Sequence, residues 1–376
     1  MVHLKVGTFL QGGKYKIEKV LGQGGFGITY LASQKISIEG PIGQIETEIK
    51  LAIKEFFMKE VCNREEDSNV VTIPSVGSKQ LAERFKQKFI KEAWNISKLK
   101  HPHIIKVVDV FEENETAYYV MEYHGNGSLN SYIKQNGAMP EDEATKYILQ
   151  IADALDYVHK QQMNHLDIKP DNVLLNNKGE AVLIDFGLSK CYDAEGEQTS
   201  STPIGVSAGY APLEQSRVGG VGTFSPATDI YSLGATFYKL VTGQTPPDAS
   251  VVLDEGLPVF PSSVSLSVVD TIKKAMQPRK MDRFSNVDDF LQGLTSSSQN
   301  NLSVHKETPI QINVDEETII ITNNLNENAE NNDNKSNQSD LPSSENNVDH
   351  NWGCLIFIVI GLFLFIAWFI YLDRFL

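Results

Sequence analysis

The stretch NHLDIKPDNVLL, residues 164–175, packs a histidine, two aspartates, a lysine and an asparagine into eight positions between apolar residues. Asp167 and Asn172 are five positions apart, with Lys169 between them. Further along the chain, Asp185 directly follows the apolar run AVLI. Two interpretations stand at this point: a polar surface turn, or a site of chemistry whose polar side chains are held in place by the apolar residues on both sides.

The residue types in this stretch suit the transfer of a metal-bound phosphoryl group. Such chemistry needs hard oxygen ligands for Mg²⁺, a carboxylate that orients the attacking hydroxyl, and a cation beside the phosphoryl group. Asn172 and Asp185 can supply the metal ligands. Asp167 can act as the base, and Lys169 can supply the cation.

A glycine-rich segment, LGQGGFGITYLA at residues 21–32, contains the pattern G-x-G-x-x-G at Gly22, Gly24 and Gly27. Glycines let the backbone approach a phosphate closely, and free N–H groups can bind it. The dinucleotide-binding fold uses the same pattern, but there the glycines open a helix. Here β-branched and aromatic residues follow, which predicts two strands joined by a glycine turn and disfavours a nicotinamide cofactor. A flexible hairpin tip is the alternative interpretation.

Lys54 ends the strand-like segment LAIK. Its apolar neighbours Ala52 and Ile53 indicate an ammonium near the core, which needs an anionic partner. The segment at 79–99 has helical spacing of its apolar residues and carries Glu92. We therefore expect Lys54 and Glu92 to form an ion pair aimed at phosphates; a solvated surface lysine is the alternative.

These motifs, in this order, resemble those of the eukaryotic-type (Hanks-type) serine/threonine protein kinases that also occur in bacteria. APLEQ at 211–215 is similar to the family's A-P-E motif, with one leucine inserted before Glu214. The helix-like segment from Asp229 is similar to the central helix of the large lobe. Arg283 is similar to the arginine that pairs with the A-P-E glutamate, so Glu214 is its expected partner. The resemblance covers residues 12–294.

The resemblance implies an α+β protein kinase fold with two lobes, a small β-rich N-terminal lobe and a larger helical C-terminal lobe. The sequence pattern agrees, with short strands around YKIEKVLG, GITYLAS and KLAIKEFF and a long helix after Pro140. The implied cofactors are ATP and Mg²⁺, or Mn²⁺ in its place. The residues assigned to nucleotide binding are Gly22, Gln23, Gly24, Gly25, Phe26, Gly27, Thr29, Ala52, Lys54, Met121, Glu122 and His124. Those assigned to catalysis are Lys54, Glu92, Asp167 and Lys169, and those assigned to the metal are Asn172 and Asp185.

The implied substrates are proteins with serine or threonine hydroxyls. By this resemblance, a lysine two residues after Asp167, here Lys169, is typical of the serine/threonine class. Ser207 stands where that class carries a threonine that bonds the catalytic aspartate. Leu166 stands where many kinases carry an arginine that pairs with a phosphate on the activation segment. Since leucine cannot do this, we expect that phosphorylation is not a strict on-switch through residue 166. Within 197–207, the candidate autophosphorylation sites are Thr199, Ser200, Ser201 and Thr202.

The composition separates this unit from the rest of the chain. The 376 residues carry a formal net charge of -15, which argues against a nucleic-acid-binding protein. Ten acidic and two basic residues lie in 295–351, and asparagine makes up 11 of the 30 residues at 322–351. We expect this segment to be a disordered linker, because it buries too little apolar surface to offset its ordering entropy.

The segment WGCLIFIVIGLFLFIAWFIYL, residues 352–372, contains 21 uncharged residues. At ~1.5 Å per residue, a helix of this length spans roughly the 30 Å hydrocarbon core of a bilayer. We expect a single-pass transmembrane anchor, with the kinase domain on the cytoplasmic side because no secretory signal precedes it. Two other functions stay open at this point: a pseudokinase scaffold, and a small-molecule phosphotransferase of kinase-like fold.

Overall fold

The computed structural model describes residues 3–40, 43–65, 68–186, 190–191, 207–215 and 224–300. Most of the predicted linker at 295–351 and all of the apolar segment at 352–372 lie outside these ranges. The candidate phosphorylation sites Thr199, Ser200, Ser201 and Thr202 also lie outside them. Within the described ranges, no helix combines the length and the apolarity that a membrane crossing requires.

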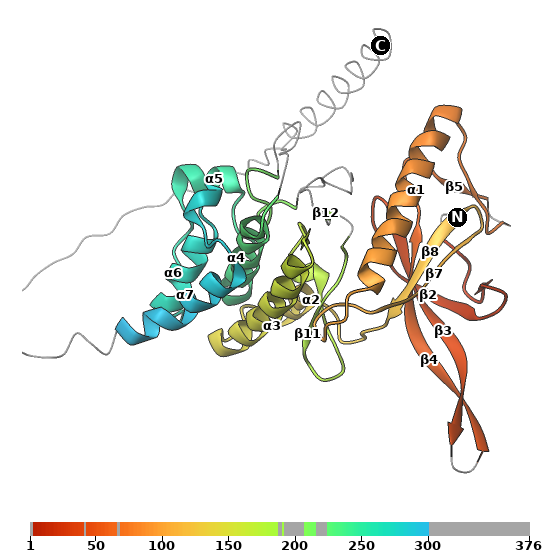
Figure 1. Cartoon of the computed structure of the whole chain (residues 1–376), viewed down its shortest axis with the longest axis horizontal. Helices are drawn as coiled ribbons and strands as arrows, with labels where there is room; N and C mark the ends of the chain where they lie inside the picture. Colours follow the sequence, from red (N-terminus) through yellow and green to blue (C-terminus); the bar gives the residue numbers. More distant parts are fainter. Residues whose placement is uncertain are drawn as a thin grey trace, which may run out of the picture. The chain divides into compact units, whose positions relative to one another are not determined.

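A six-stranded antiparallel sheet forms the N-terminal lobe (Figure 1). The strands lie in the spatial order β1-β2-β3-β4-β8-β7. Their bounds are Phe9–Leu10 for β1, Tyr15–Gln23 for β2, Gly27–Gly40 for β3, Gly43–Phe56 for β4, Val107–Glu113 for β7 and Thr116–Glu122 for β8. At the start of β2, Tyr15 and Ile17 are buried and Lys16 is exposed, as expected for a strand with one covered face.

Helix α1, Val76–Ser97, packs against this sheet. Phe89 on the helix lies 5.8 Å from the ring of Phe56 and 5.0 Å from the ring of Tyr119, measured between ring centroids. The linker before α1 contains a short strand pair, β5 at Asn63–Arg64 and β6 at Val71–Thr72. The structure thus confirms the helix that the sequence predicted after the Lys54 strand.

Strands β3 and β4 form a hairpin that extends well beyond the rest of the sheet (Figure 1). β2 pairs with β3 only as far as Ser33, and β8 pairs with β4 only from Leu51. From Gln34 to Lys50, β3 and β4 therefore pair only with each other. The sequence predicted shorter strands around GITYLAS and KLAIKEFF, so it underestimated this hairpin.

Helices form most of the C-terminal lobe. Their bounds are Leu129–Asn136 for α2, Glu141–Lys160 for α3, Pro226–Thr242 for α4, Ala249–Glu255 for α5, Leu266–Ala275 for α6 and Val287–Asn300 for α7. The short strand pairs are β9 (Met163–Asn164) with β12 (Lys190–Cys191) and β10 (Val173–Leu175) with β11 (Ala181–Leu183), and the 3-10 turns are η1 (Pro170–Asn172) and η2 (Lys280–Asp282). The predicted layout of a β-rich lobe followed by a helical lobe is confirmed.

Helix α4 is buried at the centre of this lobe. Of its 17 residues, PATDIYSLGATFYKLVT, 14 are buried, and the polar Thr228, Asp229, Ser232 and Thr236 are among them. Gly234 permits close packing on α6, because a Cβ at this position would lie 2.7 Å from the Cβ of Ala275. Asp229 lies in the first turn of α4, where the helix dipole stabilises a carboxylate. This helix therefore presents one buried carboxylate to the loop that precedes β10.

Candidate active site

The carboxylate of Asp167 lies in a network of hydrogen bonds. Lys169 Nζ donates to its two oxygens at 3.0 and 2.8 Å, and Ser207 Oγ donates to Oδ1 at 2.6 Å. Asn172 Nδ2 donates to Oδ2 and to the carbonyl of Asp167, each at 2.8 Å. Lys169 also donates to Ser207 Oγ at 2.8 Å. The structure thus brings Asp167, Lys169 and Asn172 together and adds Ser207 from a distant segment.

Asp229 fixes the backbone of this loop from below. Its Oδ1 accepts the N–H of Leu166 at 2.8 Å, and its Oδ2 accepts the N–H of His165 at 2.9 Å. Oδ2 also lies 2.8 Å from Nε2 of His159 on α3. Although burial opposes the charge, these hydrogen bonds hold the pKa of Asp229 below its usual value. An ionised carboxylate therefore braces residues 165–172, which we call the catalytic loop.

Leu166 occupies a special backbone position in this loop. Its φ angle is 66°, in the left-handed region that a leucine rarely adopts, and its side chain is buried. Its N–H is held by Asp229, and its carbonyl accepts a hydrogen bond from Nε2 of Gln215. The surrounding hydrogen bonds therefore impose this conformation on Leu166, immediately before Asp167.

Lys54 and Asp185 form an ion pair between the two lobes. Lys54 Nζ lies 2.7 Å from Oδ1 of Asp185. Although burial opposes the ammonium charge, the carboxylate holds the pKa of Lys54 well above its usual value, and the ammonium holds the pKa of Asp185 below its usual value. Like Leu166, Asp185 has a positive φ, at 61°. Both charges are therefore present and face each other.

Glu92 does not form the predicted ion pair with Lys54. Among the described residues, the ion-pair partner of Lys54 is Asp185 alone. Burial raises the pKa of Glu92 to about 8, and the more distant charge of Lys54 only partly opposes this effect. The expectation was wrong for this arrangement because Asp185, which lies far away in sequence, is closer to the ammonium than Glu92.

The predicted nucleotide-binding glycines lie at the turn between β2 and β3. Gly24 N–H donates to the carbonyl of Gly27 at 2.9 Å, which closes the turn. A Cβ at Gly27 would lie 2.7 Å from the carbonyl oxygen of Glu55, so only glycine fits against β4. Gly22, Gln23, Gly24, Gly25 and Phe26 are exposed. Their backbone is therefore accessible beside the Lys54 strand.

The remaining predicted nucleotide residues lie on neighbouring strands. Thr29 is opposite Lys54 across β3 and β4, and Ala52 is opposite Met121 across β4 and β8. Glu122 ends β8, and His124 follows it. Nε2 of His124 is buried and lacks a hydrogen-bond partner within the described ranges. A buried polar atom of this kind fits a site that a ligand completes.

Asn172 and Asp185 are the predicted metal ligands. The described ranges contain no cluster of three or more His, Cys, Asp and Glu side chains able to hold a metal ion. A pair of oxygen donors still fits Mg²⁺, because this ion is commonly bound by one or two protein groups together with substrate phosphates. Ile184 N–H donates to the carbonyl of Asn172 at 2.9 Å, which ties the segment before Asp185 to the catalytic loop.

Glu214 and Arg283 form the ion pair that the sequence predicted. Arg283 donates through Nη1 to Oε1 at 2.7 Å and through Nη2 to Oε2 at 3.1 Å, a bidentate arrangement. Arg283 is buried and also donates to the carbonyls of Gln277 and Pro278 at 2.6 and 2.8 Å. The inserted leucine before Glu214 therefore does not prevent this contact.

Comparison with known proteins identifies the family. Residues 58–302, more than half of the chain, match the family model of the protein kinase domain. The chain belongs to the protein kinase family. This match begins after the glycine turn and Lys54. The assignment of these residues to the nucleotide site therefore rests on their position in the sheet.

The relatives of this kinase include bacterial proteins. The serine/threonine-protein kinase PrkC of Bacillus subtilis is 31% identical over 288 residues, which cover 74% of this chain and 39% of PrkC. The serine/threonine-protein kinase B of Synechocystis sp. is 29% identical over 75% of this chain and 46% of its own length. This chain thus spans less than half the length of these relatives. The solved structure titled "PpkA-294 apo form" has the same fold, with a TM-score of 0.61, 24% identity, and coverage of 78% of this chain and 100% of that one.

Two residues of the kinase site were missed by the sequence analysis. His159 contacts Asp229, which braces the catalytic loop. Gln215 donates a hydrogen bond directly to the carbonyl of Leu166 in that loop. The sequence around His159 does not predict this contact, because its partner Asp229 is 70 residues away. Gln215 follows Glu214 directly, but nothing local shows that it turns toward Leu166.

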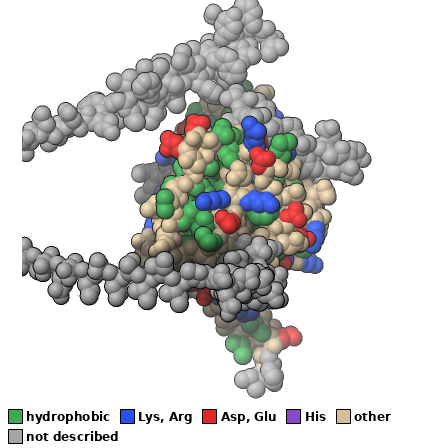
Figure 2. Space-filling view, turned by 90° about the vertical axis from the view of Figure 1, so that its left-hand side faces the viewer, with side chains coloured by type: hydrophobic (Ala, Val, Ile, Leu, Met, Phe, Trp, Pro, Cys, Tyr) green, Lys and Arg blue, Asp and Glu red, His purple; other side chains and the backbone are tan. Residues whose placement is uncertain are grey.

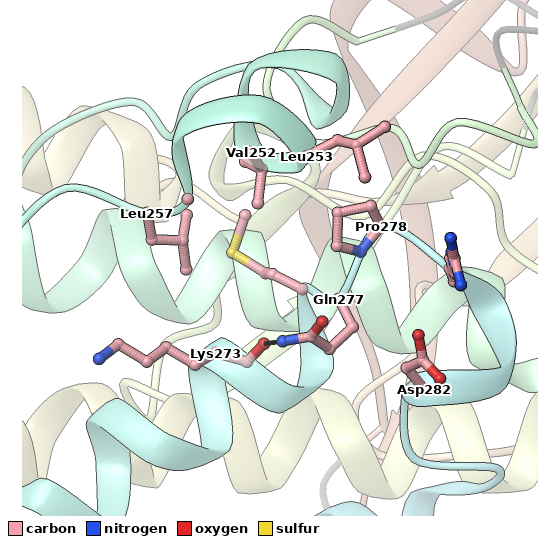
Figure 3. A pocket seen from close by; sticks show the side chains of 10 residues that line it. Val252, Leu253, Leu257, Lys273, Gln277, Pro278 and Asp282 are labelled. Atoms are coloured by element: carbon pink, nitrogen blue, oxygen red, sulfur yellow. Dashed lines mark hydrogen bonds between the residues drawn. The ribbon is translucent and has the colours of Figure 1, made fainter.

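A pocket of about 520 Å³ lies in the helical lobe (Figure 3). It is lined by Val252, Leu253, Gly256, Leu257, Lys273, Met276, Gln277, Pro278, Arg279 and Asp282. None of the residues predicted to bind ATP or metal lines it. Figure 2 views the lobe from the side of α5 and α6, where hydrophobic and basic side chains lie next to each other on the surface.

Proposed function

We propose that the chain is an ATP-dependent protein serine/threonine kinase. The observation that carries this proposal is the network around Asp167, in which Lys169, Asn172 and Ser207 all contact one carboxylate. Asp185 lies close to this network and pairs with Lys54 from the other lobe. The names of the bacterial relatives support the same activity.

In this mechanism Asp167 orients the hydroxyl of the substrate and accepts its proton. Lys169 supplies a positive charge next to Asp167, where it can also stabilise charge that develops on the transferred phosphoryl group. Asn172 and Asp185 would hold Mg²⁺, and the glycine turn at 22–27 and Lys54 would hold the phosphates of ATP. When bound, the metal neutralises phosphate charge during the transfer. The protein therefore contributes mainly position and electrostatic stabilisation.

The proposed substrates are proteins with serine or threonine hydroxyls. Ser207 supports this class because its hydroxyl bridges Asp167 and Lys169, as expected for a hydroxyl that replaces the threonine of the serine/threonine class. The Glu214–Arg283 pair favours a protein substrate over a small molecule, since it fixes the A-P-E-like segment. We also propose that the segment 197–207 contains autophosphorylation sites.

A labelled-ATP assay tests this function. The full chain is incubated with ATP, Mg²⁺ and a generic protein substrate, next to the variant Asp185→Ala and the control Asp254→Ala, which changes an exposed carboxylate on α5. We expect phosphorylated serine or threonine with the wild-type chain and the control, and at least a ~100-fold lower rate with Asp185→Ala. Equal signals from all three proteins would mean a scaffold without this activity. Transfer to a small molecule alone would support the related phosphotransferase.

We further propose that residues 352–372 tether the kinase domain to a membrane, with that domain in the cytoplasm. The support is the sequence of this segment, 21 uncharged and mostly apolar residues after a polar linker. The tether would raise the local concentration of the kinase near membrane substrates. Removal of 352–376 should release the chain from membranes in cell fractionation and lower phosphorylation of its substrates in cells. Unchanged phosphorylation would contradict the proposed role of the tether.

A further inference from the structure

A buried ion pair lies on β4 directly beside the active-site lysine. Glu55 follows Lys54, and since successive side chains of a strand point to opposite faces, the two project to opposite sides of the sheet. The Glu55 carboxylate is fully buried and pairs with Nη2 of Arg64, whose side chain is 2% exposed. A buried charge is unfavourable unless it is paired and hydrogen-bonded, so this contact constrains both residues strongly.

Two tyrosines complete the surroundings of Glu55. Tyr30 OH donates to Oε2 at 2.7 Å, and Tyr118 OH donates to Oε1 at 2.9 Å. Burial raises the pKa of both phenols, so both keep the proton that they donate. Tyr30 lies on β3 and Tyr118 on β8, the two strands that flank β4. The carboxylate therefore joins three strands at the position next to Lys54.

Arg64 belongs to the linker between β4 and α1. Its Nε donates to the carbonyl of Asn69 at 3.0 Å, and its guanidinium lies 5.4 Å from the centroid of the Phe57 ring. The same linker is held to the sheet at Val71, whose N–H donates to the carbonyl of Asn114 at 2.9 Å. The linker is thus attached to the sheet just before α1 begins at Val76.

Helix α1 in turn contacts the active site. Phe85 on α1 lies 5.6 Å from the ring of Phe26 in the glycine turn, and Phe89 packs on Phe56 at the end of β4. Glu92 lies one to two turns further along the helix. A shift of α1 would therefore move both the Phe85 contact with the glycine turn and Glu92, whose charge acts on Lys54.

We infer that Glu55 and Arg64 form a clamp that positions α1, and with it Glu92, relative to Lys54. The clamp acts through the linker, so both members are positioning residues and neither touches ATP or the substrate. This inference deepens the proposed kinase function and rests on it for its meaning. The clamp should stabilise α1 more than it stabilises the helical lobe, and this difference can be measured without an activity assay.

Hydrogen exchange resolved by peptide tests the clamp in the full chain. Arg64→Met leaves the Glu55 charge buried and unpaired, so a double variant, Glu55→Gln with Arg64→Met, removes both charges and protects folding. The matched control is Lys50→Met, which lies on β4 like Glu55 and removes exposed ion pairs to Glu18 on β2 and Glu48 on β4. We expect the amides of 76–97 to exchange about tenfold faster in the double variant, with those of α3 and α4 unchanged.

Enzyme kinetics supply the second readout. The KM for ATP should rise about fivefold in the double variant and remain at the wild-type value in Lys50→Met, because α1 contacts the glycine turn through Phe85 and Phe26. Unchanged exchange in 76–97, or equal acceleration in α1, α3 and α4, would overturn the clamp and indicate a role in general stability alone. If the wild-type chain has no kinase activity, the proposed function fails, but the exchange experiment still decides the clamp.

Discussion

Lys54 and Asp185 meet across the two lobes, with the ammonium 2.7 Å from a carboxylate oxygen. Lys54 lies on β4, and Asp185 follows β11, 131 positions later in the chain. Glu92 on α1 is the second acidic group whose charge acts on this ammonium. The ammonium thus pairs with one carboxylate, while the charge of a second acidic group acts on it.

The first prediction concerns the pH dependence of Glu92. Its pKa is raised by burial from 4.5 to about 8, so between these values the folded chain holds a proton that the unfolded chain has released. The free energy of unfolding of the wild-type chain should therefore fall as pH rises from about 4.5 to 8, relative to Glu92→Gln. Chemical denaturation of both proteins at pH 6 and pH 8.5 measures this. A difference between them that does not change with pH would contradict the assignment.

A second prediction concerns the hydroxyl of Ser207. Ser207→Ala removes a hydrogen bond to each of Asp167 and Lys169, so the base loses part of its positioning. We expect kcat to fall about tenfold, since hydrogen bonds to charged groups contribute on this scale. Ser207→Thr keeps the hydroxyl and should restore most of the rate. Steady-state kinetics with the three proteins measure the effect, and equal rates for alanine and serine would exclude this role.

The Glu214–Arg283 pair leads to a stability prediction. Arg283→Met leaves the Glu214 carboxylate without its bidentate partner and removes the donors to the carbonyls of Gln277 and Pro278. Loss of one member of a buried pair should lower the free energy of unfolding by about 3–5 kcal/mol. Lys280→Met, an exposed change in the adjacent 3-10 turn, should alter it by less than ~0.5 kcal/mol. Similar denaturation midpoints for both variants would show that the pair contributes little.

Leu166 leads to a prediction about regulation. Its side chain is buried and cannot pair with a phosphate on the activation segment. Activity should therefore largely survive treatment of the purified chain with a phosphatase. The measurement compares the rate of substrate phosphorylation before and after treatment, with mass spectrometry to verify that 197–207 is free of phosphate. A fall to near zero would show that phosphorylation acts as a strict switch by another route.

Local sequence patterns predicted most of the contacts in the catalytic loop and the order of the two lobes. Asp167, Lys169 and Asn172 lie within six positions, so their meeting follows from one short loop. The Arg283–Glu214 pair could be predicted only through the family resemblance, since 69 residues separate the two. The helix after Pro140 begins where predicted, with three acidic residues in its first turn.

The remaining features depend on contacts between segments far apart in the chain. The sequence paired Lys54 with Glu92, because no local pattern shows how closely Asp185 approaches the ammonium. The burial of Glu55 could not be predicted either, because its three hydrogen-bond donors come from β3, β8 and a linker. Burial of a charged residue inside a strand cannot be inferred from alternation alone, since the same pattern fits an exposed glutamate.

The β3–β4 hairpin has a practical consequence for work on this protein. Between Gln34 and Lys50, its strands pair only with each other, whereas Lys54 is held in register by Thr29 and Tyr119. Shortening the hairpin by matched residues, or inserting a reporter peptide near its tip, should thus leave the strand pairings around Lys54 intact. The chain offers a labelling site on the same two strands that carry its active-site lysine.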